Sequence, residues 1–403
     1  MTKKIKTDLL VIGAGAGGLS VAAGAAQLGI KVILLEGDKM GGDCLNYGCV
    51  PSKALISFSS QKKPKQFGEA MSFVKQAIKE IEPHDSEERF RSLGVNVIRE
   101  YGRFVDVKTV AAGAYEIQSR RIVIATGVHT PVPEINGLSD VHYYTNQSIF
   151  DLEQKPEHLL ILGGGPVGVE LAQAFTRLGI KVTVFEKQKI LSNFNREHVE
   201  LLRSNLENDG VNLKEEASIK DISQVGNKLT IQLENSDKIT GSHLLVATGK
   251  KPNLQNLNLQ AAGINFSDIG IETDQYLRTN NKKIYAIGDV AQFENFTNVA
   301  SYHAGIVLKS ITTGLKTRVQ KETQPRVIYT TPEIGSVGLS KTQAERKYGN
   351  KLKISRVNFS ENDRAITDNK KLGWIEIYIY RNLVVGASVI GIGAGACEAI
   401  DIT

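Results

Sequence analysis

Two cysteines lie close together in a glycine-rich segment, GGDCLNYGCVPSK, at residues 41–53. Four residues separate Cys44 from Cys49, and a proline and Lys53 follow closely. Upstream, a Gly-x-Gly-x-x-Gly motif at residues 13–18 closes an apolar, strand-like run, as in many nucleotide-binding turns. A dithiol placed soon after a nucleotide site predicts electron transfer between a bound cofactor and a disulfide.

Disulfide chemistry requires a thiolate, because the thiolate and not the thiol attacks a disulfide. A helix N-terminus or a nearby cation lowers the pKa of a cysteine. The loop before Pro51 can supply the first and Lys53 the second, although an exposed surface lysine is the simpler alternative. A zinc site would need about four ligands. No second Cys/His pair with ligand spacing occurs in the sequence, so no metal is expected.

The nucleotide motif occurs twice, and this repeat predicts how the chain is organised. Each copy has an apolar strand, three glycines, a helix, and a second strand ending in an acid eighteen residues after the last glycine. The defining residues are Gly13, Gly15, Gly18 and Glu36 in the first copy, and Gly163, Gly165, Gly168 and Glu186 in the second. In such a unit the glycines allow a tight turn, close approach of a pyrophosphate and helix–strand packing. The repeat therefore predicts two dinucleotide sites; two purely structural turns are the alternative.

Other patterns complete an α/β fold. The helices of the two copies are expected at Leu19–Leu28 and Val169–Leu178, and an amphipathic helix over Phe73–Arg91. Strands are expected at Glu116–Thr126 and Ile284–Val290. After about residue 323, strand-like runs predict an antiparallel sheet; these runs are Val327–Thr330, Lys351–Val357, Trp374–Tyr380 and Leu383–Ile390.

Length and composition limit the class of protein. A chain of 403 residues is too long for one hydrophobic core, so two or three domains are expected. The net charge of +6 is small and the basic residues are scattered, which argues against a nucleic-acid partner. The N-terminus resembles a signal peptide, but Asp8 interrupts the apolar run. No apolar run is long enough for a membrane helix, so a cytoplasmic protein is expected, with Cys397 as a small buried residue.

The assembled motifs resemble the pyridine nucleotide-disulfide oxidoreductases, the family that includes dihydrolipoyl dehydrogenase, glutathione reductase and mercuric reductase. The resemblance covers essentially the whole chain. It rests on the cysteine segment, both glycine motifs, the Ala-Thr-Gly turns at 125 and 247, IYAIGDV at 284–290, YTTPEIGSVGLS at 329–340 and NDRAIT at 362–367. It implies two Rossmann-like domains and an incomplete α+β interface domain. The expected ranges are 1–150 for FAD binding, 151–270 for NAD(P) binding, 271–322 for a return to the FAD domain, and 323–403 for a truncated dimerisation domain.

The resemblance also implies roles for single residues. Cys44 and Cys49 would form the active disulfide, with Cys49 as the thiolate beside the flavin and Cys44 exchanging with substrate. Lys53 would lie against the reactive nitrogen of the flavin, paired with Glu170. The expected cofactor contacts are Gly13, Gly15, Gly18, Glu36 and Asp289 for FAD, Gly163, Gly165, Gly168 and Glu186 for the nicotinamide dinucleotide, and Gly42, Lys53, Thr126, Gly127 and Gly249 for one of the two. The simpler alternatives are a solvated helix face for Glu170 and a helix cap for Asp289.

The choice of nicotinamide cofactor follows from the second acid. An acid at the ribose-binding end of a strand favours free hydroxyls and repels a 2′-phosphate. Glu186 therefore favours NAD(H). Lys187 and Lys189 lie close by in the sequence and could tolerate a phosphate, which leaves NADP(H) as the alternative.

Two segments depart from the family pattern. The family carries a histidine and a glutamate in an HPxxxxE-like segment, whereas the last histidine here is His303 and residues 391–400 resemble the start of a helix that the family continues. We therefore expect a weakened or lost homodimer and slow disulfide turnover. The chain between Ser57 and Phe73 is also shorter than usual in the family. Because this region normally helps to shape the substrate face, the identity of the substrate is left undecided.

The leading hypothesis is a FAD-dependent, NAD(H)-linked disulfide oxidoreductase of the dihydrolipoyl dehydrogenase type. Its partner would be a small-molecule disulfide or dithiol, or another electron acceptor. The alternatives are a mercuric-reductase-like or quinone- and dye-reducing flavoprotein, and a catalytically impaired flavin-binding remnant.

Overall fold

The structure is a computed structural model that describes residues 2–61, 66–292, 297–320 and 324–393. The chain divides into two compact units. The first comprises Met1–Pro51, Lys75–Pro131 and Lys250–Lys321, and the second comprises Ser52–Val74, Val132–Gly249 and Glu322–Thr403. The expected domain boundaries stay predictions, and the expectations for Cys397 and residues 394–400 fall outside the described residues.

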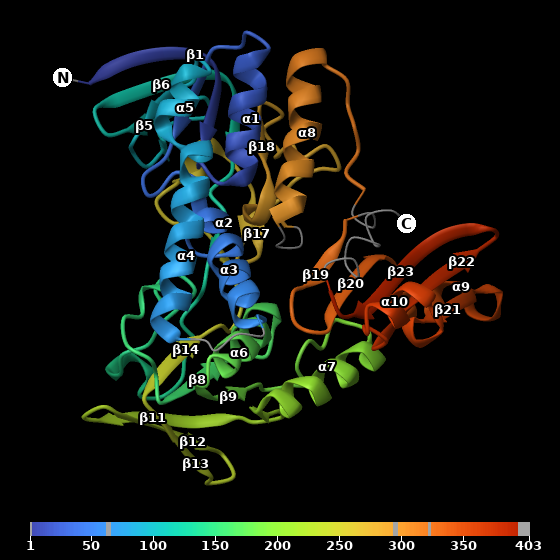
Figure 1. Ribbon diagram of the computed structural model, residues 1–403. Helices are drawn as coiled ribbons and strands as arrows, with labels where there is room; N and C mark the ends of the chain where they lie inside the picture. The colour runs from blue at the N-terminus through green and yellow to red at the C-terminus, as the bar shows by residue number, and fades with distance from the viewer. Residues whose placement is uncertain (1, 62–65, 293–296, 321–323, 394–403) are drawn as a thin grey trace. The chain divides into compact units, whose positions relative to one another are not determined.

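The first unit is built on a mixed sheet with the strand order β3-β2-β1-β6-β5-β4, in which β18 also pairs with β6 (Figure 1). The strands are β1 Lys3–Ile12, β2 Val32–Leu35, β3 Asn96–Ile98, β4 Arg103–Phe104, β5 Thr109–Ala112, β6 Tyr115–Ile124 and β18 Ile284–Ala286. Strands β1, β2, β3, β6 and β18 are parallel, whereas β4 and β5 are antiparallel. Leu9, Leu10 and Val11 in β1 are fully buried, as expected of a central parallel strand covered on both faces.

Helices α1 (Ala16–Gln27) and α8 (Thr297–Thr313) lie side by side and cover one face of this sheet (Figure 1). A Cβ on Gly24 would lie 2.6 Å from Leu308 Cδ1, so a larger residue there would make the leucine side chain shift. On the opposite face, side chains of the sheet, including those of β4 and β5, pack against the segment from Leu254 to Ile271. Short ladders in that region join β7 Val128–His129 to β15 Lys251–Pro252, and β16 Phe266–Ser267 to β17 Gly270–Ile271.

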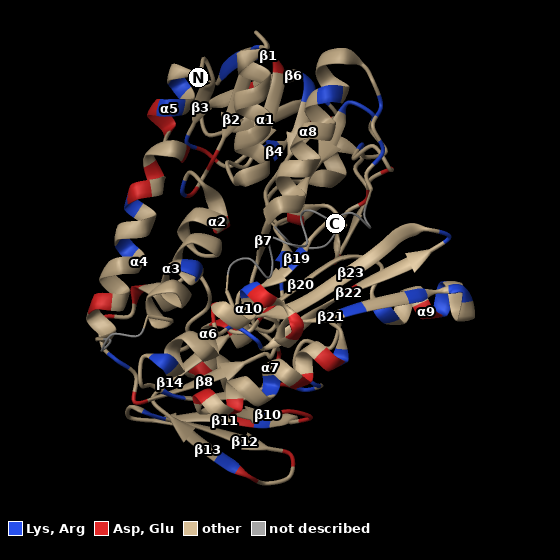
Figure 2. Cartoon of the chain, turned by 45° about the vertical axis from the view of Figure 1, so that its right-hand side comes forward, with Lys and Arg blue, Asp and Glu red and all other residues tan. Residues whose placement is uncertain are grey.

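The dithiol segment opens a series of helices, which are α2 Gly42–Asn46, α3 Cys49–Ser59, α4 Phe67–Ile81 and α5 Glu87–Ser92. The helical region expected over Phe73–Arg91 is helical but is not one continuous helix. A 3₁₀ turn at Glu82–Asp85 separates α4 from α5, because Pro83 has no backbone N–H to continue the α-helical pattern. Ser86 then caps α5 by accepting a hydrogen bond from the backbone N–H of Arg89. Both acidic and basic residues lie along α4 (Figure 2).

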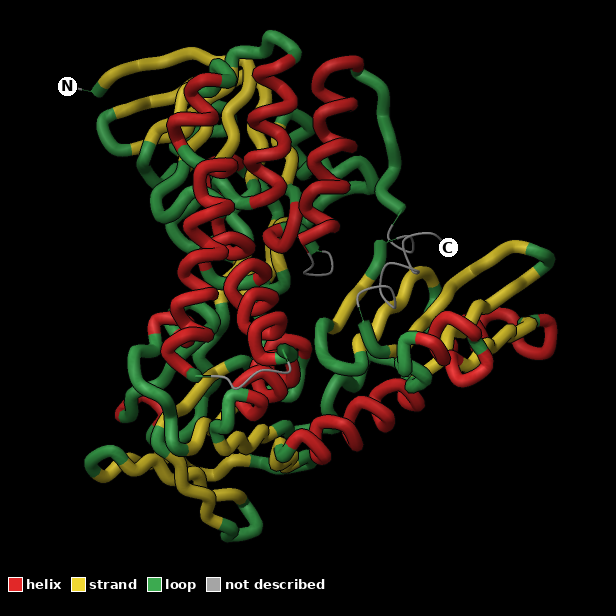
Figure 3. Tube along the Cα trace, in the orientation of Figure 1, coloured by secondary structure: helices red, strands yellow, loops and turns green. Residues whose placement is uncertain are grey.

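The second unit contains a parallel sheet with the order β10-β9-β8-β14 and an antiparallel meander of β11, β12 and β13 (Figure 3). The elements are β8 His158–Leu162, α6 Pro166–Arg177, β9 Lys181–Phe185, α7 Arg196–Asp209, β10 Val211–Lys214, β11 Ile219–Val225, β12 Lys228–Leu233, β13 Lys238–Gly241 and β14 His243–Val246. Helices α1 and α6 each begin three residues before the expected start. The last three residues of each motif, which end at Gly18 and Gly168, already belong to the helix, and Pro166 is compatible with a first helical turn.

The C-terminal sheet of the second unit is antiparallel, as predicted, in the order β19-β20-β23-β22-β21. Its strands are β19 Arg326–Ile328, β20 Glu333–Gly338, β21 Lys353–Asn358, β22 Gly373–Tyr380 and β23 Leu383–Gly391, with helices α9 Lys341–Tyr348 and α10 Asp363–Thr367. The buried carboxylate of Glu376 contacts Arg356 at 2.6 Å and Lys341 at 3.5 Å. These cations compensate the cost of burying the charge.

Among the described residues, no helix has the length and apolar character needed to cross a membrane.

Candidate cofactor and dithiol site

The first glycine turn forms an open cradle between β1 and α1. Gly13 has φ +104°, and a Cβ there would lie 2.4 Å from the carbonyl oxygen of Ala125. A Cβ on Gly18 would lie only 1.9 Å from the oxygen of Gly13. A Cβ on Gly15 would meet nothing within 4 Å, and Gly15 directly precedes α1. The turn therefore leaves room beside a helix N-terminus, which suits the pyrophosphate of FAD.

The second glycine turn repeats this geometry between β8 and α6. Gly163 has φ +107°, and a Cβ on it would lie 2.4 Å from the oxygen of Ala247. A Cβ on Gly168 would lie 1.9 Å from the oxygen of Gly163, whereas Gly165 again faces open space. The residues of both turns therefore fit a dinucleotide, which supports the sequence-based prediction of two equivalent units.

The acids that close the two units support these turns from the ends of the second strands. One oxygen of Glu36 accepts a hydrogen bond from the N–H of Ala14 at 2.7 Å, and the other accepts one from Asp38. Glu186 accepts in the same way from Gly164 at 2.7 Å and from Gln188. Both carboxylates thus lie beside a glycine turn, where they could accept hydrogen bonds from the ribose hydroxyls of a bound dinucleotide.

The dithiol segment packs directly on the first glycine turn. The backbone N–H of Gly41 donates to the oxygen of Ala14 at 3.0 Å. A Cβ on Gly42 would lie 2.7 Å from the Cα of Gly15, so only glycine allows this approach. Cys44 follows in the short helix α2, and Cys49 is the first residue of α3. The fold therefore fixes the two thiols next to the predicted FAD turn.

The two cysteines are thiols in this structure and differ in their surroundings. The hydrogen bond to the side chain of Cys49 raises the pKa of the Cys44 thiol, and burial raises it further. The sulfur of Cys49 lies 3.1 Å from the hydroxyl of Thr297, the first described residue of α8. The N-terminus of a helix favours a thiolate, and Cys49 holds that position in α3. The raised pKa of Cys44 favours its protonated form.

Lys53 and Glu170 form a short ion pair in the second unit. Lys53 follows Cys49 by one turn of α3, and its Nζ lies 2.7 Å from Oε2 of Glu170 on α6. The side chain of Glu170 is only 5% exposed, so the alternative of a solvated helix face is wrong. The other oxygen of Glu170 accepts a hydrogen bond from the backbone N–H of Tyr329 at 2.9 Å. The ring of Tyr329 lies against the ammonium, 4.5 Å from centroid to Nζ.

Asp289 lies in a 3₁₀ turn directly after β18. Strand β18 ends at Ala286, earlier than expected, because Gly288 turns the chain with φ +66°. Burial raises the pKa of the Asp289 carboxyl, and Lys250, at 3.6 Å, opposes this shift. The fully buried His303 accepts a hydrogen bond from the backbone N–H of Gly288 through Nδ1, which holds the turn in place.

The first Ala-Thr-Gly turn is held by three hydrogen bonds with Asn253. The hydroxyl of Thr126 donates to the oxygen of Asn253 at 2.9 Å, and the side-chain amide of Asn253 donates back to Thr126. The N–H of Asn253 also donates to the oxygen of Gly127. Gly249 has φ +125°, a conformation that favours glycine, and it faces open space. The roles of these turns in cofactor binding stay predictions.

Four residues around the predicted site were missed by the sequence analysis, namely Lys250, Thr297, His303 and Tyr329. Thr297 is 248 positions from Cys49, and Tyr329 is 159 positions from Glu170. No local pattern relates such distant positions. Tyr329 does begin the quoted motif YTTPEIGSVGLS, and Lys250 directly follows the second Ala-Thr-Gly turn, which are the signals that could have pointed to them.

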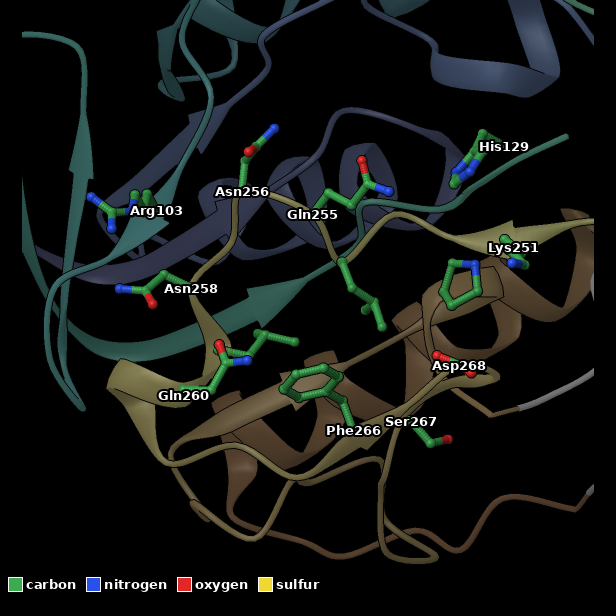
Figure 4. Close-up of a pocket in the computed structure, with 13 residues that line it drawn as sticks. Arg103, His129, Lys251, Gln255, Asn256, Asn258, Gln260, Phe266, Ser267 and Asp268 are labelled. Atoms are coloured by element: carbon green, nitrogen blue, oxygen red, sulfur yellow. The ribbon is translucent and has the colours of Figure 1, made fainter. Parts of the chain in front are cut away.

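A separate hollow of about 550 Å³ lies in the first unit, beside the β7–β15 ladder (Figure 4). Its lining contains none of the predicted site residues. The basic side chains do not converge, because Arg103 lies at one end and His129 and Lys251 lie at the other (Figure 4).

Among the described residues, no three His, Cys, Asp or Glu side chains gather in a group that could hold a metal ion.

Comparison with known proteins agrees with this geometry. The family profile of the pyridine nucleotide-disulphide oxidoreductases matches residues 7–306, and the profile of their dimerisation domain matches residues 324–402. Mercuric reductase from Staphylococcus aureus is 32% identical over 410 aligned positions, covering 96% of this chain and 75% of that protein. Dihydrolipoyl dehydrogenase from Staphylococcus aureus is 31% identical over 415 positions, covering 97% of this chain and 88% of that protein.

The fold is also similar to that of the HOCl-induced flavoprotein disulfide reductase RclA from Escherichia coli, solved as a Cu(II) complex. The TM-score is 0.89 with 26% sequence identity, covering 98% of this chain and 92% of that chain. The dimerisation profile indicates the homodimer of the family. The sequence motifs, the two glycine cradles and these matches show that the chain belongs to the pyridine nucleotide-disulfide oxidoreductases, enzymes that use FAD and a pyridine nucleotide.

Proposed function

We propose that this chain is a NAD(H)-linked disulfide oxidoreductase of the dihydrolipoyl dehydrogenase type. The observation that carries the proposal is the hydrogen bond from Gly41 to Ala14, which attaches the dithiol segment to the first glycine cradle. A cofactor bound in that cradle would lie next to Cys44 and Cys49. The second cradle, with Gly165 open and Glu186 at its edge, supplies a site for the nicotinamide dinucleotide.

The dithiol exchanges electrons with substrate by thiol–disulfide exchange. Bound FAD supplies the carrier for two electrons between nicotinamide and sulfur. In the direction of substrate reduction, the Cys44 thiolate attacks a substrate sulfur, forms a mixed disulfide and releases one substrate thiol. Cys49 then attacks the Cys44 sulfur, which closes the Cys44–Cys49 disulfide and releases the second substrate thiol. The reverse sequence oxidises a dithiol substrate and leaves both cysteines reduced.

The contacts of the two sulfurs support this division of roles. Cys49 is placed to carry charge, at the first position of α3 and 3.1 Å from the hydroxyl of Thr297. The raised pKa of Cys44 means that it holds a proton near neutral pH. Since only the thiolate reacts, exchange at Cys44 should become faster as the pH rises. The Lys53–Glu170 pair supplies a fixed cation one turn beyond Cys49.

The substrate class is tested by comparing activities on one preparation. We expect NAD⁺-dependent oxidation of dihydrolipoamide to be slow but to exceed NADH-dependent reduction of Hg(II) in kcat/KM, and we expect NADH-dependent reduction of dyes or quinones to be faster than either. Mercuric reductase is the second candidate, because the Staphylococcus aureus mercuric reductase is 32% identical. Hg(II) reduction as the faster activity would replace the proposed type with this alternative. The expectations of a weak dimer and slow disulfide turnover rest on residues beyond 391 and stay predictions.

The nicotinamide preference is expected to depend on Glu186. Its carboxylate lies at the end of β9 beside the second cradle, where it would accept from ribose hydroxyls and repel a 2′-phosphate. We expect the wild type to prefer NADH, and Glu186→Arg to shift the NADH/NADPH ratio of kcat/KM towards NADPH by about tenfold or more. Lys187 and Lys189 are exposed and could assist the phosphate.

The control is Glu186→Gln, which can still accept the hydrogen bond from Gly164 but carries no charge. It should shift the ratio in the same direction and by less. Steady-state kinetics with a dye acceptor and both nucleotides give the ratio for all three proteins. A wild type that prefers NADPH would show that the assignment of NAD(H) is wrong.

A further inference from the structure

Tyr329 contacts both members of the Lys53–Glu170 pair, and it does so with different groups. Its backbone N–H donates to Oε1 of Glu170 at 2.9 Å. Its ring lies against the ammonium of Lys53, with Nζ 4.5 Å from the ring centroid. Oε2 of Glu170 accepts from the same ammonium at 2.7 Å. The ammonium therefore lies between a buried carboxylate and an aromatic face.

The loop that carries Tyr329 is fixed to α6 at two points. Glu170 accepts from Tyr329, and one turn later Gln173 both accepts from the N–H of Thr331 and donates to its oxygen, each at 2.7 Å. Both side chains on α6 are almost completely buried, at 4% and 2% exposure. Thr330 between them is also buried. The ring of Tyr329 is thus presented on a rigid support, although the residue itself is 41% exposed.

A lysine needs such support because its side chain is long and flexible. The ammonium is a compact charge on a flexible chain of four carbons, so a single ion pair leaves the lysine side chain free to adopt several orientations. An aromatic face adds a favourable interaction with the cation and restricts its direction. This contact is made by the ring of Tyr329, which phenylalanine also carries, so Tyr329→Phe should keep it.

We propose that Tyr329 is a positioning residue that holds the Lys53 ammonium in place through its aromatic face. The proposal rests on the proposed function and on the family resemblance, which implies that Lys53 lies against the reactive nitrogen of the flavin. A displaced ammonium would stabilise the developing charge less well, and small displacements from a reacting centre are costly. Tyr329 would act on the rate of hydride transfer through Lys53 and would leave nucleotide binding unchanged.

The test uses the FAD-loaded full chain and the rate of flavin reduction after rapid mixing with NADH. Tyr329→Leu removes the aromatic face and keeps the backbone N–H. We expect it to lower the limiting rate by about fivefold or more, with the apparent Kd for NADH unchanged. Tyr329→Phe, the matched control, should stay within about twofold of the wild type. The melting temperature and flavin content of each variant show whether it has folded.

A double-mutant cycle tests whether the effect passes through Lys53. In a Lys53→Met background, Tyr329→Leu should cause no further loss in the limiting rate. A pH titration of the charge-transfer absorbance accompanies the double-mutant cycle. In the two-electron-reduced protein, the pH at which this absorbance appears should rise in Tyr329→Leu. It should not rise in Tyr329→Phe. A displaced cation stabilises the neighbouring thiolate less well.

The outcomes separate this inference from the proposed function. A wild type that holds no flavin or is not reduced by NADH would overturn the proposed function and the inference with it. A wild type that behaves as proposed, together with an unchanged Tyr329→Leu, would overturn the inference alone. Equal losses from Tyr329→Leu with and without Lys53 would also overturn it, because the ring would then act on another group.

Discussion

Cys44→Ser is expected to show a long-wavelength charge-transfer absorbance in air, without any reductant. Cys49 can then no longer close a disulfide with position 44, so its thiolate, at the start of α3 and 3.1 Å from Thr297, stays beside the flavin. Cys49→Ser should show no such band at any stage of reduction. Both variants should lose disulfide turnover to below about one thousandth of the wild-type rate, because each lacks one sulfur of the exchange.

Visible spectra of the purified variants, followed by anaerobic titration with NADH, measure the band. Coupled assays with a disulfide and a dithiol measure turnover. Cys397→Ser is the matched control and should behave as the wild type in both. Identical spectra for the two active-site variants would show that the roles of Cys44 and Cys49 are assigned wrongly.

Gly15→Ala is expected to produce a folded protein that holds little flavin. A Cβ at this position meets no atom within 4 Å in the structure, so the chain itself can accommodate it. The same Cβ would occupy the space that a pyrophosphate needs. Overfilling a fitted site costs about 1–3 kcal/mol, which corresponds to a loss of FAD affinity of about 5- to 150-fold. Flavin content and FAD titration of the apoprotein measure this loss.

Gly165→Ala is the matched variant in the second cradle, where a Cβ would also meet nothing within 4 Å. It should keep its flavin and instead raise the KM for NADH by a similar factor. Gly68→Ala, on helix α4 with open space around the Cβ, should change neither property. Loss of flavin from Gly165→Ala would show that the two cradles are assigned the wrong way round. Full flavin in Gly15→Ala would show that the assignment of FAD to the first cradle is wrong.

Local patterns predicted those parts of the fold that short-range physics determines. The strand–glycine–helix units could be predicted because the steric restrictions on Gly13 and Gly18 are local and severe. A Cβ at either position would clash with the backbone. The starts of α1 and α6 were placed too late, because the last glycine of each motif already belongs to the first helical turn. The break between α4 and α5 was missed although Pro83 signals it, since the apolar pattern continues across the break.

Contacts between distant segments could not be obtained from patterns in the same way. The pairing of Lys53 with Glu170 joins positions 117 residues apart, and it was predicted only through the family resemblance. Thr297 and Tyr329 were missed because their contacts depend on how α8 and the loop after β19 pack. A sequence motif shows that such a segment matters, but the atom that a side chain contacts depends on the tertiary fold.

The most direct test of the central claim is an anaerobic titration of the FAD-loaded wild type with NADH, followed by visible absorbance. The claim is that flavin, dithiol and nicotinamide site form one electron-transfer path. The first equivalent of NADH should reduce the Cys44–Cys49 disulfide and produce the charge-transfer absorbance while the flavin stays largely oxidised. Only further reductant should bleach the flavin. Bleaching by the first equivalent with no charge-transfer band, or no reaction with NADH, would contradict the claim.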